Sequence, residues 1–86
     1  MEWTLSKSEV WLSSVDITWA REFEGYNQRL FLSVSNEGDM FGFASHWASG
    51  SKIRSFKLDH MSRRFVTDQK EITDIWNLIY FEGESV

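Results

Sequence analysis

The feature that most constrains this chain is an alternation of apolar and polar residues, with a period of two, between Val15 and Leu58. A half-buried strand has this pattern, because successive side chains point to opposite faces of a sheet. Turn-forming residues interrupt the alternation at Glu24–Gln28 and Asn36–Asp39, and a Gly/Ser segment interrupts it at Ala48–Ser51. The pattern therefore predicts about four strands of an antiparallel sheet.

The third predicted strand has two dissimilar faces. Phe41 and Phe43 lie on one face, and Gly42, Ala44 and His46 lie on the other. Small residues in a row allow close approach, so we expect another element to pack over the Gly42 face. The regularly spaced apolar residues of the four strands are Val15, Ile17, Trp19, Phe23, Leu30, Leu32, Val34, Phe41, Phe43, Trp47, Phe56 and Leu58.

A helix is predicted near the end of the chain, from an apolar stripe with helical spacing. The stripe consists of Ile72, Ile75, Trp76, Ile79 and Tyr80. Thr67 or Asp68 can cap the start of this helix, and Gly83 can end it. Leu78 and Phe81 project away from the stripe at 100° per residue, so they need a second apolar surface, either in the same fold or on a partner.

The N-terminal segment has the pattern of a short helix. Ser6 and Glu9 have the spacing of a capping box, and Leu5 and Val10 flank it as a hydrophobic staple would. This predicts a helix from about Lys7 to Ser13, with a strand through the same segment as the alternative. The expected fold is α+β: an antiparallel sheet of about four strands, a C-terminal helix on one face and a short N-terminal helix.

Length and composition restrict the class of protein. A chain of 86 residues has material for one hydrophobic core, supplied by seven Phe, five Trp and two Tyr, so we expect a single domain over 1–86. The sequence has no cysteine and no N-terminal apolar segment like that of a signal peptide, which favours a cytoplasmic location. No apolar run approaches the roughly 20 residues of a membrane span, so no membrane association is expected.

The sequence has no motif that indicates catalysis. Cysteine is absent, and no G-x-S-x-G turn is present. His46 and His60 have neither a local catalytic partner nor a metal-ligand pattern, and the glycines are scattered singly. We therefore expect a protein that is not an enzyme and has no metal site and no cofactor.

A basic, aromatic segment at 52–65 supports one binding hypothesis, a small nucleic-acid-binding protein. Its cations are Lys52, Arg54, Lys57, Arg63 and Arg64. Single strands are held in basic grooves with aromatic platforms, which Phe56 and Phe65 could supply. However, alternation along a strand separates Lys52 and Arg54 from Lys57, and a net charge of −4 repels a polyanion. Nucleic-acid binding is therefore the alternative hypothesis.

The preferred hypothesis is a stoichiometric protein-binding domain. Trp3, Trp11, Phe31, Leu78 and Phe81 exceed what the inferred core requires, and large apolar side chains are frequent at interface hot spots. Acidic residues gather at or near the two hairpin loops, where they would form a rim if the loops lie at neighbouring corners. They are Glu22, Glu24, Glu37 and Asp39.

An acidic, chemically inert domain of this size suits an inhibitor or immunity-type protein that blocks a basic, nucleic-acid-handling partner. The partner would be a toxin nuclease or a host defence protein, although no family motif accompanies this analogy. Homodimerisation, through an exposed strand edge or through Leu78 and Phe81, is a further alternative.

Overall fold

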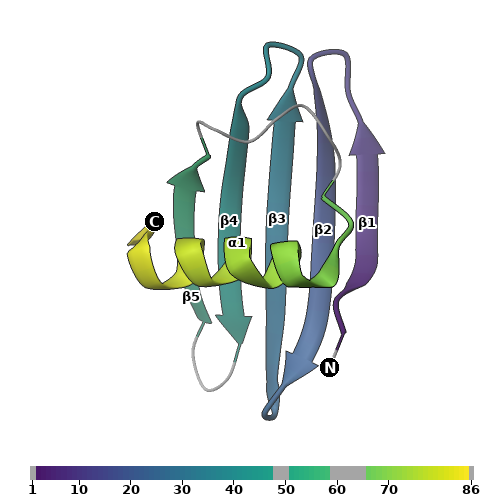
Figure 1. Ribbon diagram of the computed structural model, residues 1–86. Coiled ribbons are helices and arrows are strands. Elements are labelled where there is room, and N and C mark those ends of the chain that lie inside the picture. Colours follow the sequence, from purple (N-terminus) through teal and green to yellow (C-terminus); the bar gives the residue numbers. More distant parts are fainter. Residues whose placement is uncertain (1, 48–50, 59–65, 86) are drawn as a thin grey trace.

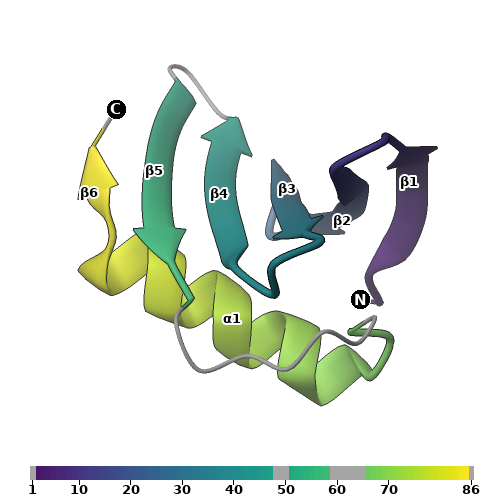
Figure 2. The ribbon, with the colours of Figure 1, turned by 90° about the horizontal axis from the view of Figure 1, so that it is seen from above.

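A computed structural model describes residues 2–47, 51–58 and 66–85 of the chain. In chain order the elements are β1 (Thr4–Val10), β2 (Ser14–Phe23), β3 (Tyr26–Ser35), β4 (Met40–Trp47), β5 (Ser51–Lys57), α1 (Gln69–Glu82) and β6 (Glu84–Ser85). The strands form one open antiparallel sheet in the order β1-β2-β3-β4-β5-β6, and α1 lies across one face (Figures 1 and 2). The predicted α+β fold is confirmed, with six strands rather than four.

The hairpin between β2 and β3 is tighter than the sequence suggests. Phe23 pairs with Tyr26, so only Glu24 and Gly25 form the turn. Both turn residues have positive φ, 53° and 81°, as a type I′ turn requires. This turn matches the twist of the two strands, and β3 consequently begins inside the predicted loop at 24–28.

The core lies between the sheet and α1. Its buried apolar residues include Ile17, Trp19, Leu30, Leu32 and Ala44 from the sheet, and Ile72, Ile75, Trp76 and Ile79 from the helix. Gly42 lies directly beneath Ile79, and a Cβ atom at Gly42 would collide with the end of that side chain. The prediction that an element packs closely over Gly42 and Ala44 is therefore confirmed.

Both ends of α1 are capped as the sequence predicts. A side-chain oxygen of Asp68 accepts a hydrogen bond from the Glu71 amide at 3.0 Å, and the Gly83 amide donates to the Ile79 carbonyl at 2.8 Å. Gly83 has a φ of −70°, which any residue can adopt. Glycine is needed there because a Cβ atom would lie 2.9 Å from the Ser55 carbonyl oxygen.

α1 has 14 residues, and the described part of the chain contains no helix with the length and apolarity to span a bilayer.

The predicted N-terminal helix at 7–13 is wrong, because this segment contributes to β1 and the turn after it. β1 pairs along β2, with an irregularity between Leu5 and Lys7. Leu5 and Val10 are exposed, so no hydrophobic staple forms. Pairing with β2 satisfies backbone groups on one side of β1 as far as Val10, and this outweighs a capping signal confined to one turn.

Trp3 belongs to the core, so the prediction that it is a surplus aromatic residue is wrong. Only 3% of its surface is exposed, and its ring centroid lies 5.6 Å from that of Trp76. The Trp3 amide donates to Gln69 Oε1 at 2.7 Å, and Gln69 Nε2 donates to the Trp3 carbonyl at 2.9 Å. The indole Nε1 donates to Thr73 Oγ1 at 3.0 Å, so Trp3 fastens the N-terminal segment to the first turns of α1.

Candidate functional site

The face of the sheet opposite α1 carries three phenylalanines. In the described part of the chain no other element lies over this face, which we call the open face (Figure 2). Phe31 of β3 pairs with Phe43 of β4, and their ring centroids are 5.8 Å apart. Phe41 and Phe43 are 45% and 36% exposed. We refer to Phe31, Phe41 and Phe43 as the phenylalanine patch.

The packing of the helix explains why these side chains face outward. Gly42 and Ala44 occupy the inner side of β4 because α1 approaches the strand closely there. Successive residues of a strand point to opposite faces, so Phe41 and Phe43 must lie on the open face. The sequence contained this information, since small residues in one row of a strand imply that the larger row faces away from the packed element.

Charged side chains border the phenylalanine patch. Lys57 pairs with Phe41 across β4 and β5, and its Nζ lies 5.9 Å from the centroid of the Phe41 ring. A groove of about 490 Å³ runs along this edge, where Phe41, Phe43 and Lys57 meet Glu82 and Glu84. The patch thus has an apolar centre and a polar border, which is the usual anatomy of a protein interface.

The open face is more acidic than basic. Among the described residues, strand alternation places Glu9, Asp16, Glu22 and Glu84 on this face, together with the basic Lys7, Arg29 and Lys57. Lys7 is paired with Glu9 at 2.7 Å, and the Ser33 hydroxyl donates to Asp16 at 2.6 Å. The charges of the described residues on this face therefore sum to −1.

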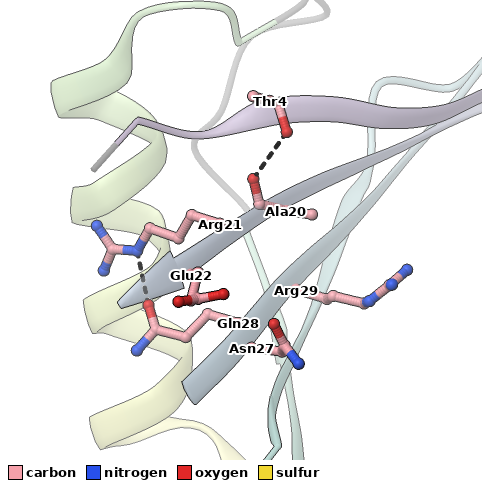
Figure 3. Close-up of a pocket in the computed structure, with 7 residues that line it drawn as sticks. All are labelled: Thr4, Ala20, Arg21, Glu22, Asn27, Gln28 and Arg29. Carbon is pink, nitrogen blue, oxygen red and sulfur yellow. Dashed lines mark hydrogen bonds between the residues drawn. The ribbon is translucent and has the colours of Figure 1, made fainter. Parts of the chain in front are cut away.

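A shallow recess of about 230 Å³ lies where the start of β1, the end of β2 and the start of β3 meet (Figure 3). Thr4, Glu22 and Arg29 line it. Arg21 and Gln28 also contribute to its wall, but their side chains point toward α1, away from Arg29. Glu22 and Arg29 therefore extend the polar border of the open face to the end of the β2–β3 hairpin.

The predicted acidic rim does not form. Glu22 and Glu24 lie at the β2–β3 turn, whereas Glu37 and Asp39 lie at the β3–β4 turn. These turns stand at opposite ends of β3, and ten residues of strand, at about 3.3 Å each, separate them by roughly 30 Å. The assumption that the two loops occupy neighbouring corners is wrong, because consecutive antiparallel hairpins alternate between the two ends of a sheet.

Leu78 and Phe81 lie on α1, on the side of the sheet opposite the phenylalanine patch. Leu78 is half-buried against the core, so the fold itself supplies the second surface that it needs. Phe81 is 71% exposed and contacts Tyr80 edge-on, with ring centroids 5.3 Å apart. Phe81 lines a cleft together with Glu24 of the β2–β3 turn, whereas Glu37 and Asp39 lie at the other end of β3.

The basic residues of 52–65 are divided between surfaces. Arg54 donates to the Gly83 carbonyl at 3.2 Å on the side of the helix, whereas Lys57 lies on the open face. Lys52 pairs through its backbone with His46, two positions from Arg54 along β5. Arg63 and Arg64 lie outside the described residues.

No group of three His, Asp or Glu side chains gathers closely enough to hold a metal ion within 2–47, 51–58 and 66–85. Compared with protein-family models, curated proteins and solved structures, the chain shows no significant match.

Proposed function

We propose that this chain is a non-enzymatic protein-binding domain whose open face covers an apolar, positively charged surface of another protein. The single observation that carries the proposal is the phenylalanine patch on a sheet face that no other described element covers. In protein interfaces, aromatic side chains surrounded by a polar border often contribute most of the binding energy. A stoichiometric inhibitor or immunity-type protein would act through such a surface.

The charges of the open face support a basic partner. Glu82 and Glu84 lie beside the exposed rings of Phe41 and Phe43 in the groove at the sheet edge. A partner that inserts apolar side chains there would gain from arginine or lysine at its own border, which would also speed association. The basic surface of a nucleic-acid-handling protein would supply such arginine and lysine side chains.

Single-stranded nucleic acid is the second candidate ligand, and the same patch favours it. Bases stack on aromatic side chains of open sheets, and Lys57 next to Phe41 could contact a phosphate. The acidic residues of the open face oppose this function, because they repel the phosphate backbone. We therefore place nucleic acid second.

The test compares three forms of the chain as affinity baits in extract from the source cells. The first is the wild type, the second carries Phe41→Thr and Phe43→Thr, and the third carries Phe81→Gln. Threonine preserves strand propensity while removing the rings, and Phe81→Gln removes a still more exposed ring from the other side of the molecule.

A protein that binds the wild type and Phe81→Gln in equimolar amount, and is lost from the double variant, supports the proposal. Equal capture by all three baits, or loss with Phe81→Gln alone, contradicts it. Fluorescence anisotropy with labelled single-stranded RNA at about 0.15 M salt tests the second candidate, since binding that the double variant abolishes would assign the patch to nucleic acid.

A further inference from the structure

A second concave site lies on the other side of the sheet from the phenylalanine patch. It is a cleft of about 370 Å³ between α1 and the hairpin of β2 and β3. β2 and β3 extend past the helix to their turn, which leaves the flank of α1 open at this end (Figure 1). The aromatic residues that line the cleft are Phe23, Tyr26, His46, Trp76, Tyr80 and Phe81.

The helix side of the cleft is an aromatic wall in which Tyr80 is the more exposed ring, because Trp76 is only 2% exposed. Trp76 and Tyr80 are stacked, with ring centroids 5.1 Å apart and planes inclined by 11°. The His46 ring stands edge-on to Tyr80 at 5.2 Å, and Tyr26 stands edge-on to His46 at 4.5 Å. Rings fixed against one another in this way offer a preformed surface for another planar ring.

Arg21 supplies a positive charge at the end of this wall. Its guanidinium lies 4.3 Å from the Trp3 ring centroid and 4.8 Å from that of Phe23. Its Nε donates to Gln28 Oε1 at 2.6 Å, and both side chains point toward α1 (Figure 3). The rings and Gln28 thus hold the guanidinium in one orientation, with its terminal amino groups available.

No carboxylate of the described residues forms an ion pair with Arg21. Glu24 lines the same cleft but is exposed and does not reach the guanidinium. Burial lowers the pKa of Arg21 below its ordinary value, because part of the guanidinium is removed from water without an opposite charge. A partly desolvated cation of this kind gains from an incoming anion.

His46 provides a second unsatisfied polar group. Its Nε2 is buried and has no hydrogen-bond partner among the described residues. The ring is held by Tyr26 and Tyr80, so this nitrogen stays beside the aromatic wall. Buried polar groups are rarely left without a partner, but this nitrogen has almost no exposed surface, so a ligand could contact it only after a neighbouring ring moves.

We propose that this cleft binds a small, planar aromatic carboxylate, with the carboxylate on Arg21 and the ring against Tyr80 and the other aromatic side chains that line the cleft. A guanidinium presents two parallel N–H groups to a carboxylate, which gives the pair both strength and direction. The cleft volume is near the lower end of the 300 to 1,000 Å³ range of small-molecule sites, which suits one compact ligand. The site is separate from the phenylalanine patch, so the proposal does not depend on the proposed function.

The first test uses the wild-type chain and two probes that differ only in charge, indole-3-acetate and indole-3-acetamide. Titrations followed by ¹H–¹⁵N NMR should shift the Trp76 indole and the amides of Arg21 and Gln28. The acetate should bind about ten-fold or more tightly than the amide, because only the acetate forms a charge-assisted pair. Equal affinities, no binding of the acetate at millimolar concentration, or shifts confined to the open face would overturn the proposal.

The second test replaces the cation. Arg21→Gln removes the charge, and Arg21→Lys keeps a charge but removes the planar fork. Arg29→Gln is the matched control, because it makes the same change on the open face of the adjacent strand. Both Arg21 variants should lose most of the preference for acetate over acetamide, whereas the control should keep it. A preference that persists in either folded Arg21 variant, or that disappears in the control, would contradict the assignment.

Discussion

Truncation of Trp3 should destabilise the domain far more than truncation of Trp11. Trp3 is 3% exposed and makes hydrogen bonds to Gln69 and Thr73 at the start of α1. Trp11 follows β1, is 54% exposed, and uses its backbone amide to bind the Ser14 carbonyl at 2.8 Å, a contact that alanine would keep. The two positions therefore compare the same substitution in the core and at a strand end.

The expected loss of stability depends on how much buried contact each tryptophan ring makes. Replacement of a buried tryptophan by alanine costs about 3–5 kcal/mol, which includes the cavity that remains. The domain as a whole should have a free energy of unfolding of roughly 4–13 kcal/mol, at about 0.05–0.15 kcal/mol per residue. Trp3→Ala should thus remove roughly a quarter or more of the stability, whereas Trp11→Ala should change it by about 0.5 kcal/mol. Trp3→Phe should cost about 1 kcal/mol for the lost bond to Thr73, in addition to any packing loss.

Urea denaturation of the three variants and the wild type, followed by circular dichroism, measures these differences. Equal losses for Trp3→Ala and Trp11→Ala would refute the placement of Trp3 in the core. A loss below about 1 kcal/mol for Trp3→Ala would refute it as well, since no buried tryptophan should be removed at so small a cost.

Three further predictions concern α1. Asp68→Ala should lower the free energy of unfolding by about 0.5–2 kcal/mol through loss of the N-cap, measured by urea denaturation; no change would contradict the cap. Gly83→Ala should cost about 1–3 kcal/mol in the same assay, because its Cβ would press on the Ser55 carbonyl; a neutral result would argue against that close approach. A hydrogen bond and the charge of Asp74 raise the pKa of Lys70, so their stabilising effect is present at neutral pH and is lost as pH rises through the raised value. NMR titration should show that Asp74→Asn lowers the Lys70 pKa; an unchanged value would show that the pair does not form.

Local patterns predicted the parts of the fold in which sequence and packing agree. The stripe from Ile72 to Tyr80 identifies the buried side of α1, and the alternation in β2, β3 and β4 identifies three central strands. β1 was predicted only as the alternative to a helix, because as an edge strand it has largely exposed residues and no apolar alternation. Its pairing with β2 depends on tertiary contacts, which the sequence of the segment alone does not specify.

The candidate sites depend on which surfaces the topology brings together. The acids at 22–24 and 37–39 are close in sequence, but a meander sends them to opposite ends of the sheet. The phenylalanine patch could have been inferred from the small residues at Gly42 and Ala44, which mark the side that the helix covers. Arg21 was visible as the one charge that interrupts the apolar side of β2, although nothing in the sequence showed that Trp3 and Phe23 would hold it.

The central claim is that the phenylalanine patch is a protein-binding surface. Isothermal titration of the purified domain with the partner recovered by affinity capture tests it most directly. We expect one-to-one binding that Phe43→Thr weakens by roughly 30-fold, as for a hot-spot ring worth about 2 kcal/mol, and that Phe81→Gln leaves unchanged. Affinity that is insensitive to Phe43→Thr, or that falls equally with Phe81→Gln, would contradict the claim.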